Sequence, residues 1–474
     1  MTPASRSQRG WGGGRGHAAG PGPREGQAGP GASAFRPSLR RAPFGIADEL
    51  SCYYDAPAEP CNVHVEVRVP GNLDSRALRD ATAAALDAQP RALVRRAAGA
   101  WWRRYAWEVP GQPDCDPVTT AAWADEGELE RARARFLSAA PPLRSSPPLR
   151  ILLAAGPGED RVILNAHHAA LDGLSSLELL RSIAEHYPGE AAADAPEGSP
   201  AAEDAPPRAA LPAPPAGVGR GVADRAQQGR AARIAADREP GRAAALPGYG
   251  FVLLPARPVP AGRRPDGGTV NDVLIAGLVV AIARWNSAHG RPSGLIRITM
   301  PVNARPQGQA GAAGNLSRLT TVSVPAPSGG CDLAGLVADV AAQTRPAKQQ
   351  SGPQVDPASR ALAAAWWPPA VKRGVLRLAL RTAGPLLCDT SLVSNLGVVG
   401  PPRFGAATVT DMWFSTSAHM PRGLSVGAVT VGGRLHLCLR YRRALFSEPS
   451  AARFAGLYAT ALGNLTSQGG DGDR

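Results

Sequence analysis

The segment Val162-Ile163-Leu164-Asn165-Ala166-His167-His168-Ala169-Ala170-Leu171-Asp172-Gly173 joins an apolar run to two adjacent histidines, a three-residue spacer and Asp-Gly. The run predicts a strand, and residues 174–187 after it have the apolar spacing of a helix. Successive side chains on a strand point to opposite faces, so only one of the two histidines can face a given cavity. A neutral imidazole there can take a proton from an alcohol, amine or thiol. The pattern therefore indicates a candidate general base with a carboxylate close behind it.

The same residues also have ordinary structural interpretations. A buried histidine can be purely structural, and Asp172-Gly173 before a helix is typical of an N-cap and turn. Ser175-x-x-Glu178 has the form of a capping box, which would leave Asp172 free to hold the histidine loop in place. We do not expect a metal site, because HH-x3-D offers three ligands on diverging faces without a supporting Cys or His cluster nearby.

Residues His167 to Gly173 resemble the HHxxxDG signature of the chloramphenicol-acetyltransferase-like superfamily. This superfamily includes nonribosomal peptide synthetase condensation domains, plant coenzyme-A-dependent acyltransferases, polyketide-associated acyltransferases and wax ester synthases. The order of hairpin, motif and helix is similar as well, and the resemblance covers about residues 44–465. It is closest to condensation domains and related stand-alone enzymes, including actinobacterial-type condensation proteins. It implies that His168 is the base, whereas Asp172 is mainly structural through a pair with an arginine.

The resemblance implies an α+β fold with two lobes, each a mixed sheet packed with helices, and a tunnel between them with His168 at its midpoint. Composition divides the chain in a compatible way, because residues 1–41 contain seven arginines against one glutamate and little to bury. We therefore expect a disordered Gly/Pro/Arg-rich tail (1–41), an N-terminal lobe that carries the motif (42–188), an Ala/Pro-rich linker or crossover (189–247), a C-terminal lobe (248–466) and a frayed tail (467–474).

Local patterns predict the main elements of both lobes. Residues 62–69 alternate with period 2, as a half-buried strand does, and Asp74 or Ser75 can cap a helix that runs to about residue 88. The other expected elements are a strand at 101–109, a hairpin of 150–155 and 161–166, a buried helix at 269–285, a strand at 295–302, a hairpin around Gly432-Gly433 and a helix at 450–465.

Further candidate site residues follow strand ends in the C-terminal half. Arg305 closes the segment Pro301-Val-Asn-Ala-Arg305, and Gly314-Asn315 comes shortly after it. This pairing resembles the superfamily, where such an arginine often pairs with the aspartate of the motif. We therefore expect Arg305 to pair with Asp172, with Arg95 as the second candidate. The alternative for Arg305 is a plain surface arginine after a strand.

The remaining candidates would position the substrate or its oxyanion. Leu392 to Gly397 resembles the Ser-Asn-Leu-Gly element of actinobacterial-type condensation proteins, although a polar strand end is the simpler interpretation. With the Gly173 N–H as a further oxyanion donor, the candidate substrate-binding residues are Arg305, Asn315, Ser394, Asn395, Trp413 and Ser415.

The net charge of +13 suggests a nucleic-acid partner at first. However, Lys348 and Lys372 are the only lysines, so 50 of the 52 basic residues are arginine, as expected from GC-rich coding. The arginines are scattered and form no basic stripe interleaved with aromatic residues. We therefore expect no nucleic-acid partner, although the Gly/Arg-rich tail leaves an RNA-binding role open.

The six cysteines are dispersed without a CxxC or a metal spacing, which is typical of a reduced, cytoplasmic protein. The N-terminus lacks the apolar core of a secretory signal. The longest uncharged apolar run, Val273 to Ala283, is shorter than the roughly 20 residues that span a bilayer. The sequence thus predicts a cytoplasmic protein without a membrane span.

The function that the resemblance implies is acyl transfer by a free-standing enzyme. The acyl group would arrive as a thioester on the phosphopantetheine of an acyl or peptidyl carrier protein or on coenzyme A, and would leave on a hydroxyl or amine of a small-molecule acceptor. Secondary-metabolite or lipid biosynthesis is the expected setting, with a monomer and without a metal or bound organic cofactor. The alternatives are a coenzyme-A-dependent O- or N-acyltransferase and a non-catalytic recruitment module that docks on a synthetase.

Overall fold

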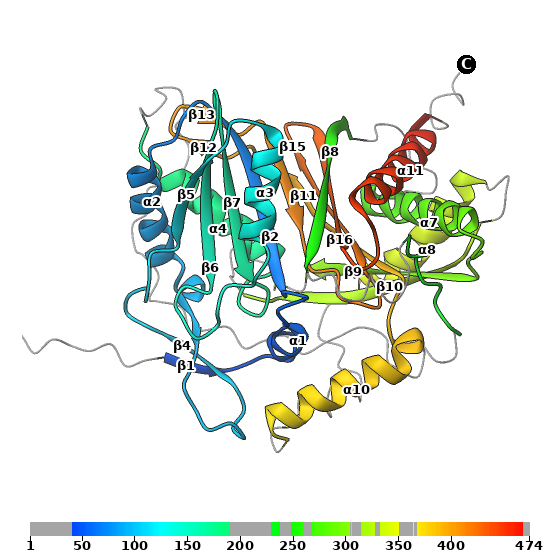
Figure 1. The fold of residues 1–474 in the computed structure, drawn as a ribbon, viewed down its shortest axis with the longest axis horizontal. Coiled ribbons are helices and arrows are strands. Elements are labelled where there is room, and N and C mark those ends of the chain that lie inside the picture. Colours follow the sequence, from blue (N-terminus) through cyan, green and yellow to red (C-terminus); the bar gives the residue numbers. More distant parts are fainter. Residues whose placement is uncertain are drawn as a thin grey trace, which may run out of the picture. The chain divides into compact units, whose positions relative to one another are not determined.

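The alternating and apolar runs of the sequence form two mixed sheets in a computed structural model of the chain (Figure 1). The structure describes residues 40–189, 229–237, 248–259, 268–303, 305, 314–327, 332–349, 364 and 367–467, which all lie in the unit Leu39–Arg474. The helices are α1 (Ile46–Tyr54), α2 (Ser75–Ala88), the 3₁₀ turn η1 (Pro90–Leu93), α3 (Glu126–Phe136), α4 (Gly173–His186), α7 (Val270–Ala288), α8 (Leu333–Gln349), α10 (Pro369–Leu387) and α11 (Glu448–Ser467).

The first sheet has five strands in the order β14-β2-β7-β6-β5. Four of them come from the N-terminal half, namely β2 (Asn62–Pro70), β5 (Val118–Ala122), β6 (Leu149–Ala155) and β7 (Glu159–His167). Because side chains alternate along β2 and β7, their valines and leucines all face one side, where α2 and α4 cover them. The opposite face of the same strands carries polar side chains such as His64 and Asn165, beside the apolar Ile163.

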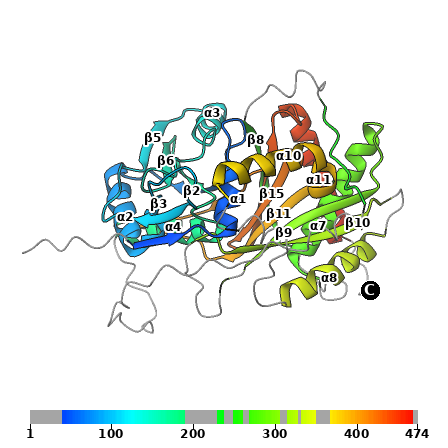
Figure 2. The same ribbon diagram turned by 90° about the horizontal axis from the view of Figure 1, so that it is seen from below.

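The second sheet has six strands in the order β10-β9-β11-β15-β16-β8. These are β8 (Tyr249–Pro258), β9 (Leu295–Asn303), β10 (Ser317–Pro325), β11 (Ser391–Val399), β15 (Leu424–Val431) and β16 (Arg434–Arg442). Helices α7, α8 and α11 gather on this sheet, as Figures 1 and 2 both show. Helix α7 is long and apolar enough to cross a membrane, but most of it is buried under α11 and α8, so it is a core helix.

The C-terminal half of the chain contributes one strand to the first sheet. Strand β14 (Asp411–Ser415) follows the short pair β12 (Arg403–Phe404) and β13 (Ala407–Thr408), and it pairs antiparallel with β2 at the edge of the first sheet. Its backbone passes directly over β15, where a Cβ on Gly427 would lie 1.9 Å from the carbonyl oxygen of Phe414. A glycine is therefore needed at position 427 for the two sheets to meet.

The fold class expected from the sequence, an α+β arrangement with two mixed sheets, is confirmed. Two local predictions are wrong. The strand expected from Trp101 begins only at β4 (Ala106–Val109), which pairs with β1 (Arg40–Pro43) and β3 (Arg95–Arg96). The capping box at Ser175 does not form, because the N-cap of α4 is Asp172, whose side chain accepts from the Ser175 N–H.

Residues 1–39, residues 468–474 and most of the expected linker lie outside the described residues. Arg40 and Arg41, expected at the end of the tail, instead belong to β1, and Ser467 ends α11. Within the expected linker, the described residues 229–237 belong to the C-terminal half, with Ile234 and Ala235 in its core. Five of the six cysteines are free, and Cys331 lies outside the described residues.

Candidate active site

The two motif histidines occupy different environments at the end of β7. His167 is buried, its Nδ1 accepts from the Ala169 N–H at 3.1 Å, and its Nε2 lies 3.8 Å from an Asp55 carboxylate oxygen. Because Nδ1 is an acceptor, the ring proton belongs on Nε2, toward Asp55. The other Asp55 oxygen accepts from the Cys61 N–H at 2.9 Å. His167 therefore holds the turn after β7 in place and ties it to the residue that follows α1.

His168 begins the turn after β7 and is only partly exposed. Its Nδ1 atom is buried and finds no hydrogen-bond partner among the described residues, which leaves Nε2 as the candidate basic nitrogen. Burial lowers the pKa of His168, and its own carbonyl group and the Asp172 carboxylate offset this only in part. The arrangement presents a neutral imidazole nitrogen at the end of a rigid strand, as a general base requires.

Asp172 is saturated with hydrogen bonds. Arg305 binds it with both terminal nitrogens, at 2.8 Å to Oδ1 and 3.2 Å to Oδ2, and both side chains are 2% exposed. The backbone N–H groups of Ser175 (2.9 Å) and Leu316 (3.0 Å) and the hydroxyl of Ser317 (3.1 Å) also donate to this carboxylate. Burial alone would raise the pKa of Asp172, but the Arg305 charge and these donors outweigh it and lower that pKa.

These contacts fasten the motif to the loop that precedes β10. The hydroxyl of Ser175 donates to the Gly314 carbonyl at 2.8 Å and accepts from the Gly314 N–H at 2.8 Å and from Arg305 at 2.7 Å. The Asp172 N–H also donates to the Gly314 carbonyl, at 3.1 Å. The neighbouring Asn315 contacts Ser51 of α1 at 3.4 Å. The pairing of Asp172 with Arg305 is thus confirmed, whereas Arg95 binds Glu108 and Asp114 instead.

Gly173 is the first residue of α4 and lies against β14 and β11, which come from the C-terminal half. A Cβ there would come within 2.7 Å of the Phe414 ring and 2.9 Å of Leu396, so only glycine fits without displacing them. In the same region, the Asn395 side chain accepts from the Gly397 N–H at 2.8 Å and donates to Asn271 of α7 at 2.6 Å. Ser394 is buried one residue earlier in β11. Their roles toward a substrate stay predictions.

Two of the candidates belong to a different polar cluster, on the face of the first sheet opposite α2 and α4. Ser415 lies 3.1 Å from His64 Nδ1, and the other ring nitrogen of His64 lies 3.3 Å from Glu66. Trp413 packs edge-on against His436, with the guanidinium of Arg161 over its ring. These contacts tie Trp413 and Ser415 to buried neighbours along β2 and β16, and none of them is with His168.

The sequence patterns missed two residues beside the motif. Asp55 follows α1 without any motif of its own, although it lies against His167. His419 follows β14, stacks on Tyr54 with ring centroids 5.4 Å apart, and has Nδ1 3.4 Å from the Tyr249 hydroxyl. Burial, followed by the charges of Arg440 and Arg422, lowers the pKa of His419 to about 3, and His168 also contributes to this shift. An isolated histidine after a run of small residues gives no sequence signal for such a position.

Comparison with known proteins places the chain among its relatives. No family model matches it. The chain is 31% identical over 442 residues to the uncharacterized protein Rv2305 of Mycobacterium tuberculosis (strain ATCC 25618 / H37Rv). The aligned region covers 88% of this chain and 97% of Rv2305. A shorter similarity, 36% identity over 80 residues, relates 17% of the chain to 16% of the putative diacylglycerol O-acyltransferase Rv2484c of the same strain.

Solved structures share the fold at low sequence identity. The first condensation domain of the CDA synthetase has a TM-score of 0.60 at 16% identity, covering 91% of this chain and 96% of that domain. The wax ester synthase/diacylglycerol acyltransferase from Marinobacter aquaeolei VT8 has a TM-score of 0.56 at 12% identity. This match covers 90% of the present chain and 100% of the synthase chain. The protein therefore belongs to the family of Rv2305 and has the fold of the chloramphenicol-acetyltransferase-like superfamily, to which condensation domains and acyltransferases belong.

Proposed function

We propose that this protein is an acyltransferase of the condensation type, with His168 as its general base. The observation that carries the proposal is the position of His168 in the motif turn, where the residue is partly exposed, one ring nitrogen is buried and the pKa is lowered. The Nε2 atom takes the proton of an acceptor hydroxyl or amine while the acceptor oxygen or nitrogen bonds to the thioester carbonyl carbon. The carbon–sulfur bond then breaks, and the proton passes from His168 to the leaving thiolate.

In this mechanism the other motif residues position the base. His167, through Asp55, and Asp172, through Arg305, hold the two ends of the turn that carries His168. The Gly173 N–H, at the start of α4, would stabilise the oxyanion together with the positive end of the helix dipole. Ser394 and Asn395 would contact the substrate in a tunnel between the two sheets. No bound cofactor is required, because the thioester brings the activated acyl group.

A carrier protein is our first candidate for the acyl donor. The likeness of the fold to condensation domains of synthetases supports this choice. Coenzyme A is the second candidate, supported by the likeness to a wax ester synthase and by the 80-residue similarity to a putative diacylglycerol acyltransferase. The product would be a secondary metabolite or a lipid, released in the cytoplasm.

A comparison of donors tests the proposal. The same acyl group is offered on a loaded carrier protein, on coenzyme A and on a short pantetheine mimic, together with a panel of alcohols and amines. Product is followed by intact mass of the carrier and by chromatography. Faster turnover from the carrier supports the first candidate, whereas faster turnover from coenzyme A supports the second. If no donor gives product with any acceptor of the panel, while the carrier protein still binds tightly, the proposal of an enzyme is refuted. The result would then favour a recruitment module.

A further inference from the structure

We propose that one surface of this protein binds anionic lipid membranes. Seven large apolar residues are strongly exposed in the described part of the chain, and five of them define this surface: Trp101 (68%), Trp102 (55%), Val371 (47%), Val375 (45%) and Leu378 (62%). We call it the Trp/α10 surface. The inference is independent of the proposed function, because none of these five residues belongs to the site around His168.

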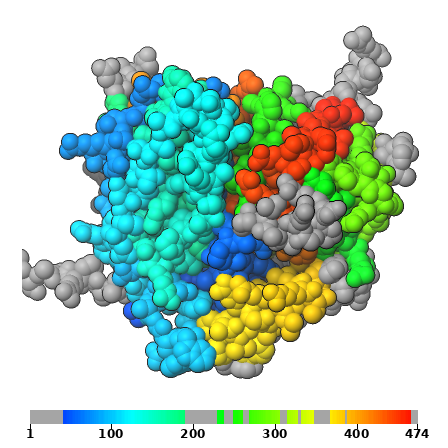
Figure 3. All heavy atoms as spheres, viewed as in Figure 1, coloured from blue at the N-terminus to red at the C-terminus, as the bar shows by residue number. Residues whose placement is uncertain are grey.

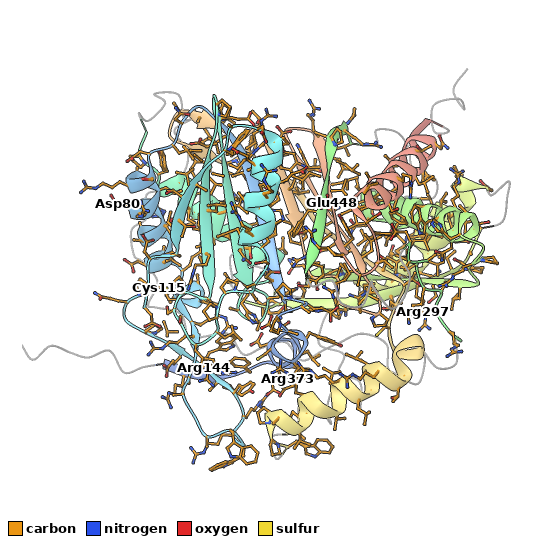
Figure 4. The ribbon with its side chains drawn as sticks, in the orientation of Figure 1. Asp80, Cys115, Arg144, Arg297, Arg373 and Glu448 are labelled. Atoms are coloured by element: carbon orange, nitrogen blue, oxygen red, sulfur yellow. The ribbon has the colours of Figure 1, made fainter. Side chains whose placement is uncertain are left out.

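The aliphatic part of the surface is a stripe on α10. Val371, Val375 and Leu378 are spaced i, i+4 and i+7, so they lie along one side of the helix. On the other side of α10, Lys372 is 1% exposed and donates to Glu49 of α1 at 3.0 Å. The next residue, Arg373, donates to the Asp55 carbonyl at 2.7 Å, and Figure 4 shows it beside α1. The helix is therefore fixed by its polar side with its apolar stripe outward.

The aromatic part is the loop between β3 and β4. Arg104, two residues after Trp102, donates to Glu49 Oε1 at 3.0 Å, while Lys372 binds Oε2 of the same carboxylate. One buried glutamate thus holds both the loop and α10. The space-filling view shows the two segments next to each other at the lower edge (Figure 3), where the ribbon also has them (Figure 1). The two tryptophans pack edge to face on each other, with ring centroids 5.6 Å apart.

The charges around the surface select its partner. Arg103, Arg377 and Arg381 are exposed beside the apolar residues. Neither α10 nor residues 97–107 contains an aspartate or glutamate. Exposed tryptophans, an aliphatic helix stripe and flanking arginines are the chemistry that inserts into the headgroup region of an anionic bilayer. A second copy of the chain is disfavoured, because it would bring two sets of arginines together.

Vesicle co-sedimentation of the full chain tests this inference. The probes are vesicles of phosphatidylcholine alone and vesicles of phosphatidylcholine with an equal amount of phosphatidylglycerol, each at low and high salt. We expect binding to the anionic vesicles that weakens with salt. The W101S/W102S and V375S/L378S variants should each lower the partition coefficient at least about tenfold, because they remove the apolar anchor. R377Q/R381Q should lower it about tenfold as well, on anionic vesicles only.

Matched substitutions elsewhere serve as controls. Val398 is 84% exposed on β11, and Arg284 and Arg291 are exposed on and after α7, so V398S and R284Q/R291Q should leave vesicle binding unchanged. Thermal melting checks that every variant is folded. Absence of wild-type binding at low salt, or equal binding by the surface variants and the controls, would overturn the proposal. Binding of an acidic carrier protein through these residues, without any vesicle binding, would overturn it in favour of a protein-docking surface.

Discussion

Asp172 combines two functions that the sequence presented as alternatives. It caps α4 through the Ser175 N–H, and it also binds Arg305 with both oxygens. No described imidazole donates to its carboxylate, so Asp172 acts on His168 through its charge and through the position of the turn. The resemblance to the HHxxxDG superfamily allowed Arg305 to be predicted, because its strand-end motif could be matched. Asp55 and His419 could not be predicted, because only the folded backbone brings them to the histidines.

The first prediction concerns the buried pair of Asp172 and Arg305. Removing either partner leaves a charge in a site that is 2% exposed, so D172A or R305A should lower the free energy of unfolding by about 3–5 kcal/mol. The double variant should lose clearly less than the sum of the two. Chemical denaturation of the four proteins measures the coupling. The exposed pair Arg181 and Glu178 is the control, with an expected coupling below about 1 kcal/mol, and additive losses at Asp172 and Arg305 would refute the pairing.

The second prediction concerns the pH dependence of acyl transfer. Because burial lowers the pKa of His168, the free base stays neutral as the pH falls past the ordinary histidine value of about 6.5. The acid limb of kcat/KM should therefore lie below that value, where the imidazole takes up a proton and can no longer accept one from the acceptor. Initial rates from pH 5 to 8, roughly the range in which histidine titrates, measure this limb. A limb centred above about 6.5 would contradict the lowered pKa.

At the scale of elements, the first residue of α4 packs against β11 and β14, two strands from the C-terminal half of the chain. Long, strongly patterned elements such as β2, β7, α2 and α7 could be predicted from the sequence, because burial enforces their periodicity. The strand expected from Trp101 does not form because both tryptophans are exposed and no strand in the described part of the chain pairs with them. The pairing of β14 with β2 could not be predicted, because pairing between strands that are distant in the sequence leaves no local pattern.

The third prediction tests the contact between α4 and β14. A Cβ at position 173 would collide with Phe414 and Leu396, so G173A should lower the free energy of unfolding by about 1–3 kcal/mol. Shortening the ring in G173A/F414L should restore part of the loss. The control is G374A in α10, where a Cβ meets nothing within 4 Å and alanine favours the helix. Equal stability of G173A and wild type would show that α4 is not packed this closely.

At the scale of the molecule, the N-terminal half of the chain completes neither its sheet nor its site by itself. The first sheet takes β14 from the C-terminal half, and Asp172 takes Arg305 and the Leu316 N–H from it. The apolar core under the first sheet also contains Phe404, Met412 and Val429. The boundary expected at residues 189–247 therefore leaves an N-terminal segment whose sheet, core and site are completed by the C-terminal segment.

The fourth prediction follows from this dependence. Residues 40–189 expressed alone would expose the edge of β2 and bury Asp172 without its arginine, so the fragment should lack a cooperative melting transition. The whole chain should unfold in a single sharp, cooperative transition. Circular dichroism and near-UV melting of both proteins make the comparison. A fragment that melts cooperatively near the temperature of the whole chain would refute the dependence.

The most direct test of the proposed function is the rate of acyl transfer by histidine variants of the whole protein. H168A should fold as the wild type does and lose about 10²-fold or more in turnover, in line with the loss of a general base. H167A should mainly lower thermal stability, because His167 holds the turn against Asp55. H186A, at the exposed end of α4, is the control and should behave as the wild type. Wild-type turnover in folded H168A, with the donor and acceptor that support the reaction, would contradict the central claim that His168 is the base.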